Sequence, residues 1–361
     1  MSESGSLDRP GSGGRPLSPN DLCNIGQVDH DDDNDGNFTQ SGQSTSSASL
    51  SPSLYEFVLE HGRTFHKYKE GKYFLPNDER EQHRLDLQHT ISKMLLKGKL
   101  GLAPVENPAH VIDLATGTGI WAIEYAEQNP LSSVLGTDLS PIQPSYLPAN
   151  CRFEIDDVED EWVYPQKFDY IHGRYMMPFI KKDWASFFAS IYEHTAPGGW
   201  AEFQETVLYF QGVDDTIEGT ALQKWNGLLL GGIKKMGRSA TEALRMKSYL
   251  AEAGFGELGE KKFAVPMNAW AKGREQKALG AMQMINNLEG IEGITMAVFT
   301  RVLGWEPKDV EELVVAVKRD LKDRKIHAYM TILCAWGRKP EKQKAEEQKA
   351  EEQKPVETRE S

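Results

Sequence analysis

A glycine-containing segment, Asp113 to Trp121 (DLATGTGIW), holds the residues of this sequence that are best suited to chemistry. It follows an apolar run that predicts a buried strand, and it opens a segment with the pattern of a helix. Gly117 and Gly119 let the backbone approach a ligand closely, and a helix N-terminus exposes free N–H groups. The segment therefore predicts a binding loop for a nucleotide-like ligand.

Two ligand classes compete for this loop. The pattern Gly117-x-Gly119-x-x-Ala122, with Asp138 about 20 residues further on, also satisfies the dinucleotide fingerprint. Asp113, however, stands where a pyrophosphate would lie, and two anions side by side repel each other. S-adenosylmethionine suits the pattern better, because it offers an ammonium group to Asp113, a ribose to Asp138, and no phosphate. A third interpretation, in which Asp113 only caps the helix and the glycines only form a turn, is less favoured.

A third acidic position follows the next predicted strand, in FEIDDVED. Asp157 is placed to accept from an adenine amino group while the backbone N–H of Val158 donates to the ring, and Asp156 is the alternative if the register shifts. Taken singly, an acid after a strand is more often an ordinary loop residue. Its place in order after Asp113 and Asp138 favours a functional role.

Composition excludes several classes of protein. The chain has 361 residues, 39% apolar and 26% charged, which is typical of globular proteins and not of collagen or coiled coils. A net charge of −13 disfavours binding to a phosphate backbone. Cys23, Cys151 and Cys334 lie far apart without a CxxC pair, which predicts no disulfide framework, no thiolate zinc site and a reducing compartment. The N-terminus lacks a secretion signal and no apolar stretch is long enough to span a membrane, so we expect a soluble cytoplasmic protein.

Low-complexity ends frame one folded region. Residues 1–50 form an acidic, Ser/Gly-rich leader that is too poor in apolar side chains to fold, and residues 341–361 form a charged tail containing KAEEQKAEEQK. Asp31, Asp33 and Asp35 resemble the start of a calcium loop, but Gly42 stands where a bidentate Glu is required. No HExxH motif occurs, so we predict no metal site. The folded region should span residues 53–340.

Strand-like and helix-like segments alternate through this region, which is typical of a parallel α/β sheet. Predicted strands are 110–115, 133–138, 151–157, 168–174, 200–210, 255–266 and 325–339; predicted helices are 119–128, 184–195, a stretch ending near 253, and a stretch over 270–324. The last helical stretch is a long insertion before the final strand. Its position predicts a cap over a site.

Several motifs in order resemble class I S-adenosylmethionine-dependent methyltransferases: DLATGTG, GTDLS, the strand end at Asp157, FDYIHGR and PGGWAEF. Over about residues 54–340, EHGRTFHKYKEGKYFLPNDEREQHRLDLQH, GTDLSPIQP and RVLGWEPKDVEELVVAVKRD are similar to the LaeA-like methyltransferases of fungal secondary metabolism. One departure is Ala115, which stands where the loop of such enzymes has its first glycine. Because alanine is small, we expect a tighter fit with binding retained.

The resemblance implies a Rossmann-like seven-stranded sheet with an antiparallel last strand. It divides the folded region into an N-terminal helical segment (53–104), a cofactor-binding core (105–212) and helical and C-terminal strand elements (213–340). It implies S-adenosyl-L-methionine as methyl donor, with the following roles: Asp113, Gly117 and Gly119 at the methionine end, Asp138 at the ribose, Asp157 and Val158 at the adenine, and Tyr73 and Arg84 closing over it. Arg84 could equally be an i,i+4 partner on a surface helix.

The acceptor side of the site is less defined. Methyl transfer is an in-line displacement, so the protein mainly aligns the acceptor and excludes water, and a base is optional. His172 and Tyr175 are best placed to take a proton, Glu205 and His89 less so, and a structural role for His172 is the favoured alternative. Six aromatic and methionine residues could wall an apolar acceptor pocket or belong to the core: Met176, Met177, Phe179, Trp184, Met282 and Met284.

These observations predict an enzyme that methylates an O or N atom of a small molecule in a fungal biosynthetic pathway. The alternative is a LaeA-like nuclear regulator of secondary-metabolite genes with protein partners, although no Lys/Arg-rich import run is present. A dinucleotide oxidoreductase is the least favoured interpretation. We expect a small-molecule acceptor and no binding to nucleic acid or membrane.

Overall fold

The computed structural model describes residues 56–60, 62–181 and 183–341. The predicted leader, its calcium-loop resemblance, and the tail beyond Glu341 lie outside the described residues. Within the described residues, no helix is long and apolar enough to cross a membrane. The same residues contain no group of three or more His, Cys, Asp or Glu side chains that could hold a metal ion.

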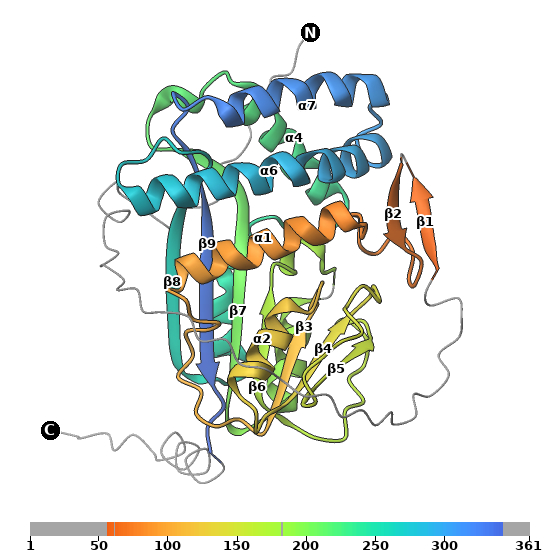
Figure 1. Ribbon diagram of the computed structural model, residues 1–361, viewed down its shortest axis with the longest axis vertical. Helices are drawn as coiled ribbons and strands as arrows, with labels where there is room; N and C mark the ends of the chain where they lie inside the picture. The colour runs from red at the N-terminus through yellow and green to blue at the C-terminus, as the bar shows by residue number, and fades with distance from the viewer. Residues whose placement is uncertain (1–55, 61, 182, 342–361) are drawn as a thin grey trace, which may run out of the picture.

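A seven-stranded sheet forms the centre of the molecule (Figure 1). Its strands are β3 (His110–Leu114), β4 (Ser133–Asp138), β5 (Cys151–Ile155), β6 (Phe168–Arg174), β7 (Thr195–Gly212), β8 (Gly256–Pro266) and β9 (Ala328–Arg338). Their order in the sheet is β5-β4-β3-β6-β7-β9-β8. The first five strands of this order are parallel to one another, and β9 is antiparallel to both of its neighbours, β7 and β8. This topology confirms the predicted seven-stranded fold with an antiparallel last strand.

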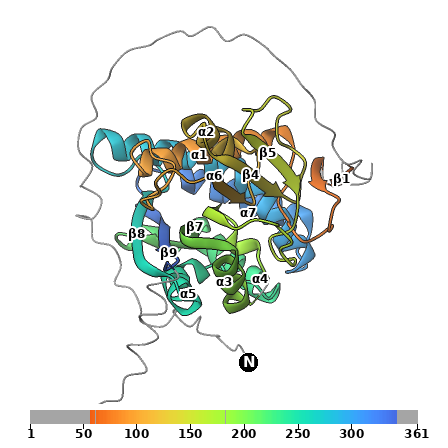
Figure 2. The same ribbon diagram turned by 90° about the horizontal axis from the view of Figure 1, so that it is seen from below.

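Burial on both faces explains why the central strands read as nearly continuous apolar runs. In β3, Val111, Ile112 and Leu114 are all almost completely buried. Helices α1 (Glu79–Leu95) and α2 (Ile120–Gln128) lie on one side of the sheet, and α3 (Trp184–His194) and α5 (Met246–Ala253) lie on the other (Figure 2). Because β5, β4, β3, β6 and β7 are parallel, their carboxyl ends lie together at one edge of the sheet, where loops can gather ligand-binding side chains.

The helical insertion lies over that edge of the sheet. It comprises α6 (Arg274–Arg301) and α7 (Pro307–Lys322), which pack on each other, with α4 (Ala221–Lys235) against both and α1 against α6 (Figure 1). This arrangement confirms the predicted helical cap. A two-stranded hairpin that the sequence did not predict, β1 (Phe57–Glu60) with β2 (Arg63–His66), precedes α1.

Asp78 ties the hairpin to the start of α1. Its carboxylate accepts the Glu81 backbone N–H at 3.0 Å, which caps the helix, and it also forms a two-pronged ion pair with Arg63. The segment between β2 and α1 is thereby held at both ends. It runs past the carboxyl edge of the sheet, where Tyr73 and Lys72 reach the cavity described below.

Candidate cofactor and acceptor site

The loop between β3 and α2 folds back over the end of β4. Thr116 donates its backbone N–H to the Thr137 carbonyl at 2.9 Å, and Gly117 donates its N–H to Oδ2 of Asp138 at 2.8 Å. Gly119 has a φ of +79°, and a Cβ there would lie 2.3 Å from the ring of Phe153. Both the left-handed backbone and the lack of space require glycine at this turn.

Ala115 is a strained position in the same loop. Its φ of +52° lies in the left-handed region, where a Cβ costs about 1–2 kcal/mol relative to glycine. The residue lines the cavity, at the point where the resembling enzymes have glycine. The loop adopts this left-handed conformation with alanine in place of glycine, and the result is backbone strain at Ala115.

Asp113 is buried at the end of β3 and is held from two sides. Its Oδ1 lies 2.7 Å from Nδ1 of His172 on the neighbouring β6, and its Oδ2 accepts the Thr116 hydroxyl. His172 in turn stacks on Trp121, with ring centroids 3.8 Å apart and an interplanar angle of 3°. These contacts fix the direction of the Asp113 carboxylate, which lines the cavity.

The predicted role of His172 as a base for the acceptor is inconsistent with this placement. The ring is 0% exposed, does not line the cavity, and has Nδ1 facing Asp113, while Nε2 has no hydrogen-bond partner among the described residues. A base must come within hydrogen-bond reach of the proton that it removes. The structural alternative from the sequence is the one that the geometry favours.

Asp138 at the end of β4 faces the same cavity as Asp113. Its two oxygens accept the backbone N–H groups of Gly117 and Ser140, at 2.8 and 2.9 Å. Burial raises the pKa of Asp138 to about 6, while those two hydrogen bonds act in the opposite direction. The carboxylate is therefore ionised at neutral pH.

Asp157, predicted to bind adenine, is already engaged in an ion-pair cluster. Lys69 lies 2.7 Å from its Oδ2, Lys72 pairs with the same atom, and the Glu159 N–H donates to Oδ1 at 3.0 Å. Burial opposes ionisation, but the two lysines outweigh it and lower the pKa of Asp157. Asp156 is also engaged, because its Oδ2 accepts the Tyr164 hydroxyl at 2.6 Å.

One cavity of about 250 Å³ brings most of the predicted residues together. The predicted residues that line it are Tyr73, Arg84, Asp113, Gly117, Asp138, Asp157, Val158 and Tyr175, together with Asp156 and His89. Gly119 and His172 do not line it: the first forms the turn into α2, and the second lies behind Asp113. The carboxylates at the loop end of the cavity suit a ligand with an ammonium group and a ribose and would repel a pyrophosphate.

Arg84 lies between the loop end and the cap. Its guanidinium pairs with both carboxylate oxygens of Glu81, at 3.0 and 2.7 Å, and donates to Oδ1 of Asn286 on α6 at 2.9 Å. Arg84 is buried, so the alternative of an ordinary surface-helix position is wrong. The residue joins α1 to the cap helix α6 and borders the cavity between them.

The other candidate bases are each occupied. Tyr175 lines the cavity and its hydroxyl lies 2.7 Å from that of Ser92; burial raises the pKa of Tyr175 to about 12, which keeps it protonated at neutral pH. Burial lowers the pKa of His89 to about 4, and its two nitrogens are bonded to Arg174 and Glu124. Glu205 does not line the cavity; it accepts the backbone N–H groups of Met176 and Met177, at 3.0 and 3.2 Å.

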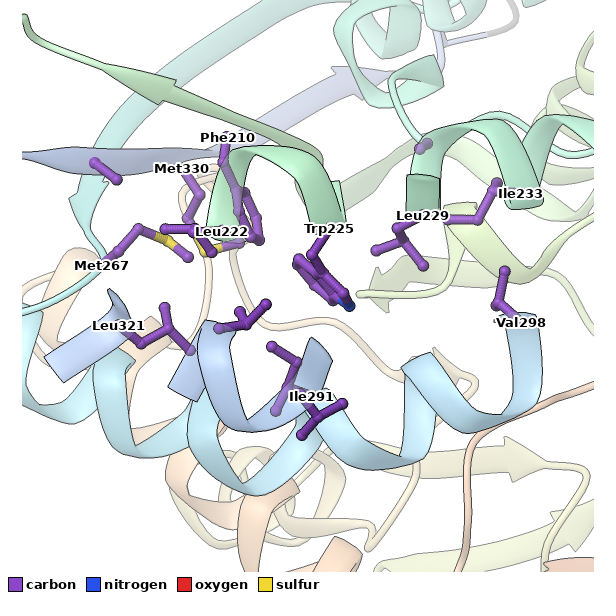
Figure 3. Packing of buried hydrophobic residues seen from close by; sticks show 14 of the residues in the cluster. Phe210, Leu222, Trp225, Leu229, Ile233, Met267, Ile291, Val298, Leu321 and Met330 are labelled. Atoms are coloured by element: carbon purple, nitrogen blue, oxygen red, sulfur yellow. The ribbon is translucent and has the colours of Figure 1, made fainter. Parts of the chain in front are cut away.

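Beyond Tyr175 the cavity continues into an apolar chamber. Its side chains come from β7, α4, α6, α7, β9 and the residue that follows β8: Phe210, Leu222, Trp225, Leu229, Met267, Ile291, Leu321 and Met330 (Figure 3). Figure 3 shows Trp225 and Leu222 of α4 facing Ile291 of α6. The chamber belongs to the same cavity as the loop end, as an acceptor site requires.

Only part of the predicted acceptor wall is confirmed as lining the cavity. Met176 and Phe179 line it, whereas Met177 is buried in the core and Trp184 packs on Phe187 in a separate cluster. Met282 and Met284 lie on α6 but outside the lining. The neighbouring face of α6 lines it instead, through Gln283, Asn286, Asn287, Gly290, Ile291 and Ile294. These residues lie three and four positions apart on one face of α6, but four of the six are Gln, Asn or Gly, so no apolar stripe in the sequence marks this face.

Comparison with known proteins agrees with this geometry. A family profile described as "Methyltransferase domain" matches residues 80–256. The chain is 38% identical to "Methyltransferase pytC" of Aspergillus terreus over 82% of this chain and 92% of that protein. It is 34% identical to "Secondary metabolism regulator LAE1" of Cochliobolus heterostrophus (80% and 97%), and 33% identical to "Protein-methionine methyltransferase laeA" of Emericella nidulans (79% and 77%).

Proposed function

Because this chain belongs to the LaeA-like family of S-adenosylmethionine-dependent methyltransferases of fungal secondary metabolism, we propose that it methylates an O or N atom of a small, mostly apolar molecule. The observation that carries this proposal is the continuity of the cavity, from the carboxylates of the β3 loop into the apolar chamber under the cap. A chamber lined by Trp225, Leu222 and Ile291 favours a compact apolar acceptor over a polar peptide segment.

In this proposal, residues at the ends of three strands bind different parts of the methyl donor. S-adenosylmethionine supplies a methyl group on a sulfonium centre that is itself the leaving group. We assign Asp113 to its ammonium group, Asp138 to the ribose hydroxyls, and Asp157 with the Val158 backbone to the adenine. Gly117 lets the loop backbone come close to the methionine end, and Gly119 supports it through the turn. Tyr73 borders the cavity from the segment before α1, and Arg84 borders it from α1.

His172 is a positioning residue in this assignment. It acts through Asp113, whose Oδ1 lies 2.7 Å from its Nδ1, and the stack on Trp121 prevents the imidazole from turning. A carboxylate held in one direction loses little freedom when it binds an ammonium group, which favours affinity.

Alignment and exclusion of water are then the main contributions of the chain to the reaction. His172 is shielded from the acceptor, Tyr175 remains protonated, and both nitrogens of His89 are occupied. The apolar chamber holds the acceptor against the loop end and keeps water away from the reacting atoms.

The compartment and partners follow the same proposal. We place the reaction in the cytoplasm, with a small-molecule acceptor and without nucleic acid, since the net charge of −13 opposes contact with a phosphate backbone. A nuclear location with protein partners belongs to the regulator alternative, which is supported by the relative named as the secondary metabolism regulator LAE1.

An assay with labelled methyl donor distinguishes a small-molecule methyltransferase from the regulator alternative. The purified chain is incubated with isotopically methyl-labelled S-adenosylmethionine and a cell extract separated into small-molecule and protein fractions. We expect label in the small-molecule fraction, and its loss in Asp113→Asn. Label confined to the protein fraction would contradict the proposal and favour the regulator alternative.

A further inference from the structure

Three side chains on one face of α6 introduce polar atoms into the otherwise apolar chamber. Gln283 and Asn286 are 2% and 6% exposed, and both line the cavity with Asn287. On β7, Thr206 also lines it, and its hydroxyl has no hydrogen-bond partner among the described residues. Buried polar groups are normally hydrogen-bonded, so unpaired ones at a cavity wall mark a place for a ligand.

The orientation of Asn286 follows from Arg84. A guanidinium can only donate, and Nη1 of Arg84 lies 2.9 Å from Asn286, so the amide oxygen must face it. The Nδ2 group of Asn286 is left without a partner within the described part of the chain. It is a free donor.

The orientation of Gln283 follows from Met267 by the same logic. A thioether sulfur can only accept, so Asn287 directs its Nδ2 to Met267, at 3.6 Å, and its Oδ1 to Gln283. Gln283 therefore donates its Nε2 to Asn287, at 2.9 Å. Its Oε1 has no donor among the residues that the structure describes and is a free acceptor.

We propose, resting on the function proposed above, that the chamber binds a neutral, mostly apolar carbonyl compound with an amide N–H, or a hydroxyl on the neighbouring carbon, beside the carbonyl. Asn286 donates to the carbonyl oxygen and Gln283 accepts from the adjacent N–H or O–H. The two residues are three apart on a helix, so their side chains lie on one face, about 5–6 Å apart at Cβ. Arg84, the cation that contacts Asn286, is already paired with Glu81, so this end of the pairing calls for a neutral ligand.

Three bicyclic probes of nearly equal shape test this pairing. Oxindole carries a carbonyl and an adjacent N–H, 1-indanone carries the carbonyl alone, and indane carries neither. Their dissociation constants are measured by ligand-observed NMR on the full chain saturated with S-adenosylhomocysteine. We expect affinity to fall from oxindole to 1-indanone to indane, by about threefold to tenfold at each step, as for single neutral hydrogen bonds. Indane binding as tightly as oxindole would overturn the proposal.

Variants of Gln283 and Asn286 show which residue causes each difference in affinity between the probes. Gln283→Met keeps the side-chain length and removes the acceptor, so oxindole should lose its advantage over 1-indanone. Asn286→Asp keeps an oxygen toward Arg84 and removes the donor, so 1-indanone should lose its advantage over indane. Gln276→Met is the matched control, because Gln276 is buried on the same helix seven residues earlier but does not line the cavity.

The preference for oxindole should remain intact in Gln276→Met; equal loss in Gln276→Met and Gln283→Met would refute the assignment. If a variant fails to fold, the probe order of the unmodified chain still decides the proposal. Binding of S-adenosylhomocysteine is titrated separately. Its absence would refute the proposed function, whereas normal cofactor binding with no probe preference would refute only the chamber assignment.

Discussion

Glu205 makes the stability of the turn beside the cavity dependent on pH. The side chain is 0% exposed on β7, and it accepts the N–H groups of Met176 and Met177. Burial raises its pKa from 4.5 to about 8, against the opposing effect of those two hydrogen bonds. Folding thus favours the protonated form, so the stabilisation is complete below about pH 4.5 and is lost as pH rises through 8.

The size of the effect follows from these two pKa values. Linkage gives a loss of about 2 kcal/mol in the free energy of unfolding between pH 6 and pH 8 from this one group. Glu205→Gln removes the titration. The free energy of unfolding of the unmodified chain and of Glu205→Gln is measured at pH 6 and pH 8 by urea titration, with tryptophan fluorescence as the signal.

We expect the stability of the unmodified chain, relative to Glu205→Gln, to fall by about 2 kcal/mol from pH 6 to pH 8. Other titrating groups, such as His89 and Asp138, contribute to both proteins and largely cancel in this difference. A difference that stays constant within about 0.5 kcal/mol would refute the reasoning, because it would mean that Glu205 is ionised in the folded protein at both pH values.

Three further predictions concern the β3 loop and its support. Ala115→Gly should raise the free energy of unfolding by about 1 kcal/mol in urea titrations, because it relieves the left-handed strain; a decrease would contradict that account. His172→Asn should weaken S-adenosylhomocysteine binding about tenfold by calorimetry while leaving the acceptor KM unchanged, and unaltered affinity would exclude the positioning role. For the unmodified chain, affinity for S-adenosylhomocysteine should fall as pH drops through about 6, because a protonated Asp138 accepts hydrogen bonds less well. Asp138→Asn should bind about tenfold more weakly at neutral pH and show a flatter profile, and a pH dependence equal to that of the unmodified chain would assign the titration to another group.

The sheet and the loop end could be predicted because local signals determine them. Apolar runs such as Val111 to Leu114 mark buried parallel strands, and parallel strands end at one edge. The order β4-β3-β6 therefore places Asp138, Asp113 and His172 side by side, which is what the structure contains. Asp113 and Asp138 both line the cavity at this edge, whereas His172 lies behind Asp113 and does not line it.

The contacts that define the rest of the site are distant in sequence and carry no local pattern. Arg84 reaches Asn286 across 202 residues, and Lys69 reaches Asp157 across 88. The α6 helix is long and rich in small and polar residues, so its cavity-facing side does not stand out as an apolar stripe. His172 was ambiguous for another reason: the end of a strand can point a side chain into a cavity or behind a neighbour, and only its pairing with Asp113 decided which.

The most direct test of the central claim compares the metabolites of a producing strain with and without this gene by untargeted mass spectrometry. We predict that one family of compounds is replaced by analogues lacking a single methyl group, and that the gene encoding Asp113→Asn reproduces the loss. If many unrelated compound families disappear together, with no unmethylated analogue in their place, the claim that this chain methylates a small molecule is contradicted.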